Sequence, residues 1–342
     1  MTSLRASLLA LAAACAVLPA AAQADSISYI KDGDVWLSTP DGGRQFRVTA
    51  TGGYSYASQA DDGTLVALKG ERLVKLSRMG DVLADFPTPV SDGPPPSVGP
   101  AANDTSANYF HGPYDPEVSP DGTKVAYTYY WQHYTYNYIS GHMEQMLVSG
   151  TAITHADRLT AWDELGGNLT GWKDPAWVDD ASLVRADAGV AMSDELVVNT
   201  LGAPEQGLVR WIKASPWLST FKQPEVNRQA TMVAAATKTG DGYATGHGLH
   251  LFRAEGGLGG SLTICHEVDD DAGGRVKMEH PTWAPSGDRL AFQAPEGIAV
   301  VTPPPCPTDG SIARVHDWSV VVPGATAPDW GPADVPASRP AA

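Results

Sequence analysis

Polar side chains stand directly before a recurring proline, or before the alanine that replaces it in one copy, and their types could form a ligand site. They comprise two carboxylates, an amide, an imidazole and a phenol, at Asp115, Asp174, Gln223, His280 and Tyr56, with Ala327 at the same place in the last copy. Oxygen donors with one imidazole suit Ca²⁺ or Mn²⁺, and they could also hold a polar ligand. An aspartate before proline is also a common turn and capping choice, so the fold must decide between these interpretations.

The proline belongs to a signature, Pro-x-(Trp or Val), that recurs along the chain. Its third residues, together with a degraded copy that ends at Gln59, lie 47 to 59 residues apart, at Gln59, Val118, Trp177, Val226, Trp283 and Trp330. Repeats of this length predict a modular architecture in which every copy is one structural unit.

Each copy except the last is followed by a turn and a short apolar run. Val118, for example, leads through Ser119-Pro120-Asp121-Gly122 to Val125-Ala126-Tyr127. Apolar runs on both sides of an Asp-Gly or Ser-Gly pair predict a tight hairpin, so each unit should begin with two antiparallel strands. Third and fourth strands are predicted at 34–37 and 46–48, 73–76 and 82–83, 249–252 and 261–264, and 298–301 and 320–322.

The two ends of the chain complement each other. Trp330 is followed by Pro332, Pro336 and Pro340. Because proline cannot donate a hydrogen bond to a neighbouring strand, the segment after Trp330 cannot form a central strand. Residues 27–30 look like the second strand of a unit that lacks its first strand. We therefore expect the strand around Trp330 to complete the first unit and close a ring, which removes two exposed sheet edges.

Composition narrows the function classes. The chain has 342 residues and a net charge of −16, with no basic stripe. This argues against binding to nucleic acid and to anionic membrane surfaces. Because the repeat covers the whole length, we predict one domain over 25–332 with a Pro/Ala-rich tail at 333–342. The predicted blades are approximately 26–49 with 326–332, 54–87, 110–160, 172–212, 222–268 and 278–324.

Residues 1–24 have the pattern of a secretory signal peptide. Arg5 precedes an apolar run from Leu8 to Leu18, and Ala22-Gln23-Ala24 is an A-x-A cleavage site. We therefore expect export to a periplasm or the cell exterior; acylation of Cys15 is the alternative. Export would leave Cys265 and Cys306 as a predicted disulfide worth roughly 3–4 kcal/mol in the chain-entropy model. Two unpaired buried thiols are the other possibility.

Aromatic residues crowd the segment 127–146, which predicts a long strand pair or a protruding hairpin. Tyrosine and tryptophan combine an apolar ring with a hydroxyl or N–H group and are common at interfaces. We therefore take as candidate partner contacts Tyr130, Trp131, Tyr134 and Tyr136. Packing within a blade would explain the same residues without a partner.

Three strings resemble the WSPDG repeat of TolB-type β-propellers: "VSPDGTKVAYTY" (118–129), "PTWAPSGDRLAF" (281–292) and "ISYIKDGDVWLSTPDGG" (27–43). The resemblance covers nearly all of the chain after residue 24. It implies an all-β fold with six four-stranded blades around a central channel, and ring closure by the terminal strands. The residues before the signature prolines would then surround one mouth of the channel.

The resemblance implies no particular reaction, and the sequence lacks a G-x-S-x-G nucleophile motif. We therefore expect an exported, non-catalytic binding or scaffold module, monomeric and without a cofactor. Its partner would be an envelope or extracellular protein or a glycan. The alternative is a metal-dependent lactonase, lyase or glycosidase that uses the channel mouth.

Overall fold

The computed structural model describes residues 25–90, 109–187, 195–202, 208–213, 218–239, 247–269 and 277–337. The predicted signal peptide and the last five residues of the predicted tail lie outside these ranges. The described residues form β-strands joined by turns and loops, and they contain no helix. It follows that none of them forms a helix with the length and apolar character needed to span a membrane.

The first sheet joins the two ends of the chain. Its order is β25 (Thr326–Gly331), β1 (Ser26–Lys31), β2 (Asp34–Ser38) and β3 (Gln45–Arg47). In the antiparallel pair β25·β1, Ile27 lies opposite Trp330 and Ser28 lies opposite Asp329. The predicted ring closure is therefore confirmed.

Five further sheets complete the ring, each built mainly from consecutive antiparallel strands. The second contains β4 (Tyr54–Gln59), β5 (Leu65–Lys69), β6 (Arg72–Leu76) and β7 (Val82–Pro87). The third contains β8 (Tyr109–Val118), β9 (Lys124–Asn137), β10 (His142–His155) and β11 (Leu169–Thr170). The fourth contains β12 (Trp172–Trp177), β13 (Ser182–Asp187), β14 (Glu195–Thr200) and β15 (Val209–Lys213). The fifth contains β16 (Leu218–Val226), β17 (Met232–Thr239), β18 (His247–Glu255) and β19 (Ser261–Val268), and the sixth contains β20 (Glu279–Trp283), β21 (Leu290–Ala294), β22 (Gly297–Val301) and β24 (Ser319–Pro323).

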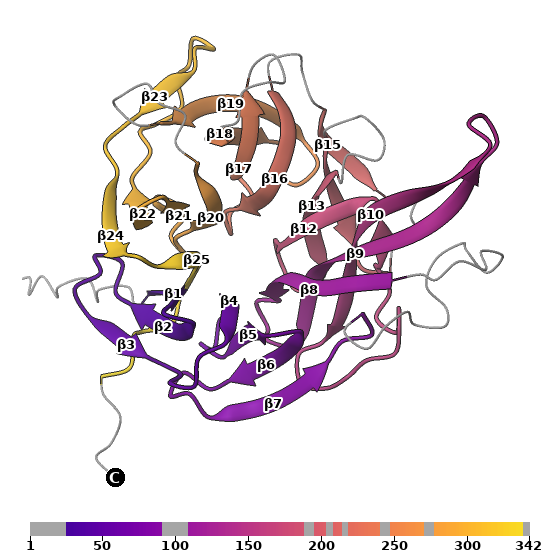
Figure 1. Ribbon diagram of the computed structural model, residues 1–342. Coiled ribbons are helices and arrows are strands. Elements are labelled where there is room, and N and C mark those ends of the chain that lie inside the picture. Colours follow the sequence, from indigo (N-terminus) through magenta and orange to yellow (C-terminus); the bar gives the residue numbers. More distant parts are fainter. Residues whose placement is uncertain are drawn as a thin grey trace, which may run out of the picture.

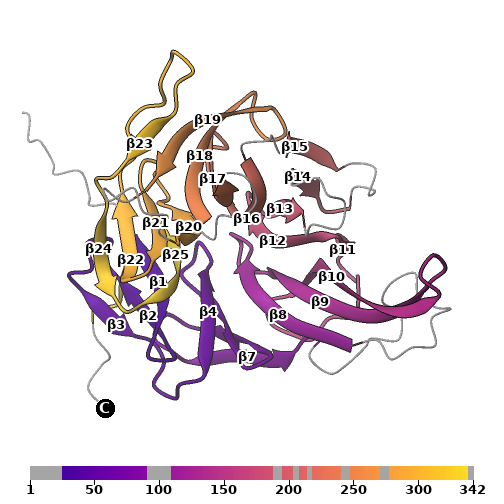
Figure 2. The same cartoon turned by 45° about the horizontal axis from the view of Figure 1, so that its top comes forward.

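The six blades surround a central axis, as the two views show (Figures 1 and 2). The innermost strands are β25, β4, β8, β12, β16 and β20, the six that carry the signature. Apolar side chains fill the spaces between neighbouring blades, and one such cluster joins Ile27, Tyr29 and Trp330 to Ile298 and Val322. The predicted fold class, a six-bladed β-propeller, is confirmed.

The signature tryptophans also fasten one blade to the next. The indole N–H of Trp177 donates to the Glu117 carbonyl at 2.8 Å, and that of Trp283 donates to the Glu225 carbonyl at 3.3 Å. Each bond runs from one inner strand to the inner strand of the preceding blade. Both indoles are buried, at 8% and 5% exposure. A tryptophan at this position therefore fixes the spacing of the strands that line the channel.

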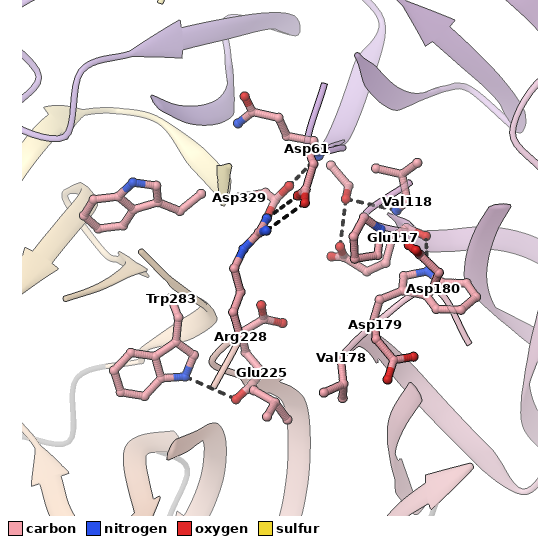
Figure 3. Close-up of a pocket in the computed structure, with 16 residues that line it drawn as sticks. Asp61, Glu117, Val118, Val178, Asp179, Asp180, Glu225, Arg228, Trp283 and Asp329 are labelled. Atoms are coloured by element: carbon pink, nitrogen blue, oxygen red, sulfur yellow. Dashed lines mark hydrogen bonds and ion pairs between the residues drawn. The ribbon is translucent and has the colours of Figure 1, made fainter. Parts of the chain in front are cut away.

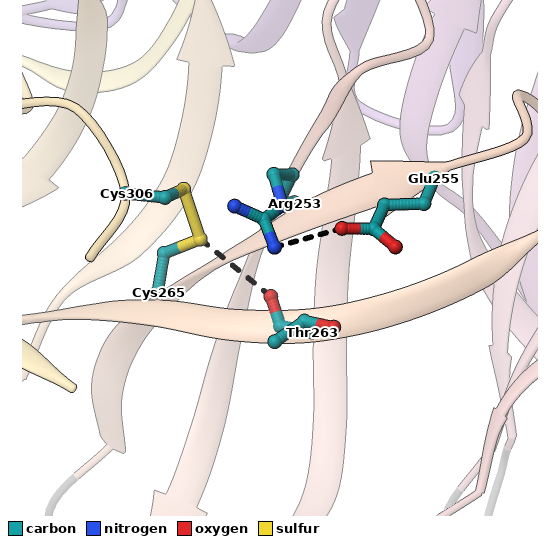
Figure 4. The surroundings of a disulfide bond; sticks show 5 residues. All are labelled: Arg253, Glu255, Thr263, Cys265 and Cys306. Carbon is teal, nitrogen blue, oxygen red and sulfur yellow. Dashed lines mark hydrogen bonds and ion pairs between the residues drawn. A yellow bond between two sulfur atoms is a disulfide. The ribbon is translucent and has the colours of Figure 1, made fainter. Parts of the chain in front are cut away.

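The fifth blade gains an extra strand from the sixth. Between β22 and β24 the chain leaves its own blade, and β23 (Ala313–Val315) pairs in parallel with β19. The same excursion carries Cys306, which forms a disulfide with Cys265 of β19 (Figure 4). The predicted disulfide is therefore present. The fifth strand was not predicted, because three residues held on a neighbouring blade leave no periodic signal.

Candidate functional site

All six residues before the signature, five of them followed by proline and Tyr56 by Ala57, adopt the left-handed backbone conformation. Their φ angles lie between 44° and 51°, at Tyr56, Asp115, Asp174, Gln223, His280 and Ala327. At each place the ladder between the inner strand and its neighbour shifts register, as between Lys173 and Ala176 in β12. Such a conformation costs a residue other than glycine about 1 kcal/mol or more, so a sixfold repetition indicates a structural role. The bulge places these residues around one mouth of the channel.

Five of them converge at this opening, which we call the narrow mouth. The rings of Tyr56 and His280 lie 5.3 Å apart, and the Tyr56 hydroxyl is hydrogen-bonded to Asp115. The Gln223 side chain lies 3.0 Å from His280 Nε2 and accepts a hydrogen bond from the His280 backbone N–H. The Gln223 N–H in turn donates to Asp174 Oδ2 at 3.2 Å. Together with neighbouring inner-strand residues, four of these side chains line a cavity of about 40 Å³, and Ala327 contributes no polar group.

Burial shifts the protonation of these groups toward their neutral forms. It raises the pKa of Asp115 to about 6, although the Tyr56 hydrogen bond and Lys173 oppose the shift. It also raises the pKa of Asp174 and lowers that of His280 to about 4. His280 is therefore a neutral imidazole at pH 7. The narrow mouth combines hydrogen-bonding groups with a carboxyl that titrates near neutrality.

A second layer of carboxylates lies deeper in the channel. Glu117, Glu225 and Asp329, here called the acidic ring, occupy the position between the signature proline and the third residue, and they border both the narrow cavity and a wider one. Glu117 accepts a hydrogen bond from Ser58 Oγ at 2.8 Å. Asp329 accepts bonds from the Gln59 N–H and from Thr282 Oγ1. Across the described part of the chain, no donor is hydrogen-bonded to the Glu225 carboxyl group.

The acidic ring is electrostatically strained. Burial, followed by repulsion from Asp329, raises the pKa values of Glu117 and Glu225 well above the ordinary range, and Glu225 adds to the repulsion on Glu117. Burial also raises the pKa of Asp329 to about 6, against the hydrogen bonds that it accepts. Because burial and mutual repulsion both disfavour the ionised forms, the ring holds protons that the unfolded chain would release.

The pH dependence of stability tests this layer. The raised pKa of Asp329 means that the folded state binds more protons than the unfolded state between pH 4 and 6, so stability should fall as pH rises through this range. In urea unfolding, the parent protein should be less stable at pH 7.5 than at pH 4.5. We expect Asp329→Asn to reduce this difference in the free energy of unfolding by about 1–3 kcal/mol. Glu296→Gln, at an exposed turn, is the control. An unchanged pH slope in Asp329→Asn would show that Asp329 is not strained.

The wider cavity opens on the other side of the ring and has a volume of about 270 Å³. Arg228, in the turn after β16, reaches across this wide mouth and forms a two-pronged ion pair with Asp61, in the turn after β4 (Figure 3). These turns belong to the fifth and second blades, which face each other across the axis. Asp179 and Asp180 line the same cavity. The wide mouth is therefore strongly acidic, with one guanidinium across it.

The channel side chains do not form a compact metal site. Among the described residues, only Cys265, His266 and Cys306 bring three potential ligand atoms within 4.8 Å of one another. The two sulfur atoms of this group are joined in the disulfide and are not thiolates, which are the form that binds metal. A small ion in the channel would have to draw the carboxylates closer together than they lie here.

The aromatic segment forms a hairpin of two 14-residue strands, β9 and β10, that projects beyond the ring (Figure 1). Of the predicted contacts, Trp131 is buried at 4% exposure and stacks on Phe110, and Tyr130 packs against Tyr114. Tyr136 is 47% exposed. Tyr134 pairs with Gln145 in the hairpin ladder, and its side chain lies outside the described set.

The most exposed apolar residues of the hairpin were not predicted. At its tip Tyr138 is 91% and Ile139 is 98% exposed, and Leu147 on β10 is 60% exposed. Tyr138 packs edge-on against Tyr136 at 5.1 Å. The acidic ring was also missed, although acidic residues at the middle position of three signature copies were visible in the sequence. No sequence pattern marked Arg228, because its partner Asp61 lies on the opposite blade and far away in the sequence.

The fold and its channel define a six-bladed β-propeller with an acidic axis and one protruding hairpin. Its structure is similar to that of a putative TolB from Agrobacterium tumefaciens, at a TM-score of 0.50, 11% identity, and coverage of 89% of this chain and 91% of that one. A putative 6-phosphogluconolactonase from Bacteroides uniformis (TM-score 0.48, 11% identity, 90% and 99% coverage) and the C-terminal WD40 domain of Sif2 (0.43, 11%, 82% and 78%) are also similar. No protein-family model and no curated protein matches the sequence. At these identities the likeness shows the fold alone.

Proposed function

We propose that this protein is an exported, non-catalytic binding module of the TolB-like type, which holds a protein partner through the β9–β10 hairpin. The observation that carries the proposal is the exposure of Tyr138 and Ile139 at the tip of the hairpin. Large apolar side chains held in water at the end of a rigid projection are typical of interaction sites. Export is supported by the leader pattern of residues 1–24 and by the disulfide, which is characteristic of oxidising compartments.

The chemistry of the tip favours a protein over a glycan. Sugars stack on flat aromatic faces, whereas Ile139 offers an aliphatic side chain suited to an apolar pocket. The lower part of the hairpin is anchored in the third blade, where Tyr127, Tyr129 and Trp131 are buried. The base of the strand pair is therefore fixed in the blade, and the tip presents its apolar side chains away from the ring.

Photo-crosslinking tests the proposed contact. A photoreactive residue in place of Tyr138 should give a discrete protein adduct in the intact envelope, and Ile139→Ser in the same protein should reduce that adduct at least tenfold. The matched control places the photoreactive residue at Val82, which is 60% exposed on the edge strand β7. Equal adducts from positions 138 and 82 would reject the hairpin as the binding site. Adducts to glycan alone would reject a protein partner.

An enzyme at the narrow mouth is the second candidate function. The convergence of Asp115, whose pKa is about 6, with Tyr56 and neutral His280 favours it, because such groups can transfer protons near neutral pH. Hydrolysis of a lactone panel by the purified protein, lost in Asp115→Asn and His280→Gln, would support this function. Equal turnover by these variants and the parent protein would exclude it.

A further inference from the structure

The wide mouth carries a large excess of negative charge. Of the described side chains that line its cavity, six carry a carboxyl group and one a guanidinium, that of Arg228, although the acidic ring keeps some of its carboxyl groups protonated. The carboxylates belong to Asp61, Asp179, Asp180 and the three members of the acidic ring. Low-dielectric walls focus such a field, so the cavity attracts cations and repels anions.

Glu225 gives the ligand preference a second, independent basis. Its side chain is half-buried in the channel, borders both cavities and accepts no hydrogen bond from the described residues. A cationic donor placed in the cavity would favour the ionised form of this carboxyl group and supply the hydrogen bond that the protein does not. Figure 3 shows its carboxyl group with no bond drawn, although Arg228 from the adjacent turn extends past it.

Arg228 shows which chemical group this site accepts. Its guanidinium binds Asp61, and its charge also acts on Glu225 and Asp329. Both partners of the Arg228–Asp61 pair are exposed to solvent, at 41% and 44%, so the pair can open at little cost. The chain thus holds a guanidinium of its own over the acidic ring.

We propose that the wide mouth binds an organic cation, a guanidinium or primary ammonium group on a short aliphatic chain, in competition with Arg228. The charged group donates to Glu225 and Asp329, and the aliphatic chain lies along the tryptophan-lined wall formed with Trp177, Trp283 and Trp330. A cavity of about 270 Å³ accommodates such a chain. A bare divalent ion fits less well, because the ring carboxylates do not converge on one point.

Calorimetric titration with agmatine, which carries a guanidinium and an ammonium group, tests this site. We expect saturable binding to the full protein, at least tenfold weaker binding to Glu225→Gln, and about tenfold tighter binding to Arg228→Met. Arg228→Lys should bind agmatine about as the parent does, because it keeps the competing charge. Glu296→Gln controls for loss of a distant negative charge, and n-butylurea controls for the uncharged chain.

The outcomes separate the possible explanations. Absence of agmatine binding, or equal affinity of Glu225→Gln and the parent, overturns the proposal, as does comparable binding of n-butylurea. Binding of Ca²⁺ without binding of agmatine would make the channel a metal site and also overturns it. Weaker binding to Arg228→Met would show that Arg228 contacts the ligand and does not compete with it. Because the hairpin is remote from this cavity, the result is independent of the proposed partner binding.

Discussion

Replacement of Trp330 with alanine should destabilise the protein by about 3–5 kcal/mol, the usual cost of removing a buried aromatic side chain. Trp330 is 4% exposed and packs with Ile27 in the cluster that joins the first and sixth blades. Its indole N–H donates to Asp25 at 3.0 Å, and the Arg289 guanidinium lies over its ring. Since a folded domain is stable by only about 5–15 kcal/mol, this loss threatens ring closure itself.

Urea unfolding of the purified variants measures this effect. Trp36→Ala is the matched control, because Trp36 is only partly buried, and its indole N–H bond to Lys31 and its contact with Arg47 both lie within the first blade. We expect the control to lose less than half as much stability. If the two variants were equally stable, the terminal strand would contribute nothing special to the ring.

Removal of the disulfide should have the second largest effect. Cys265 and Cys306 are 41 residues apart in sequence, and a crosslink across a loop of this length stabilises by about 4 kcal/mol in the chain-entropy model. The bond also holds the excursion that carries β23 against β19. In Cys265→Ser/Cys306→Ser, we therefore expect both a lower free energy of unfolding and earlier loss of the β19–β23 pairing.

Thermal unfolding of the parent protein with and without reductant provides the same comparison without mutation. Reduction should lower the midpoint to that of the double variant, which itself should not respond to reductant. If the oxidised and the reduced parent protein had the same unfolding midpoint, the disulfide would have no stabilising role.

The sequence was most informative about the inner strands. The signature proline marked five of them, and the spacing of the repeat marked the sixth, the degraded copy at Gln59, because the fold repeats the same bulge in every blade. The hairpin turns followed from Asp-Gly and Ser-Gly pairs such as Asp121-Gly122. Ring closure followed from complementary half-units at the two ends, and β25 pairs with β1 as expected.

Features made by contacts between blades could not be read from local patterns. Arg228 meets Asp61 only because the second and fifth blades face each other. Trp131 and Tyr138 look alike as aromatic residues in one segment, yet the first is buried against Phe110 and the second extends into solvent at the hairpin tip. Exposure depends on how far the hairpin extends past the blade, which periodicity does not specify.

Hydrogen exchange of the native protein tests the central claim, closure of the ring by the terminal strands, most directly. Peptides that cover Ser26–Lys31 and Thr326–Gly331 should exchange as slowly as those from the inner strand β20 of the neighbouring blade, because β25 is hydrogen-bonded to β1 and packed against the sixth blade. Rapid exchange of both terminal segments, with β20 still protected, would show an open ring and contradict this account.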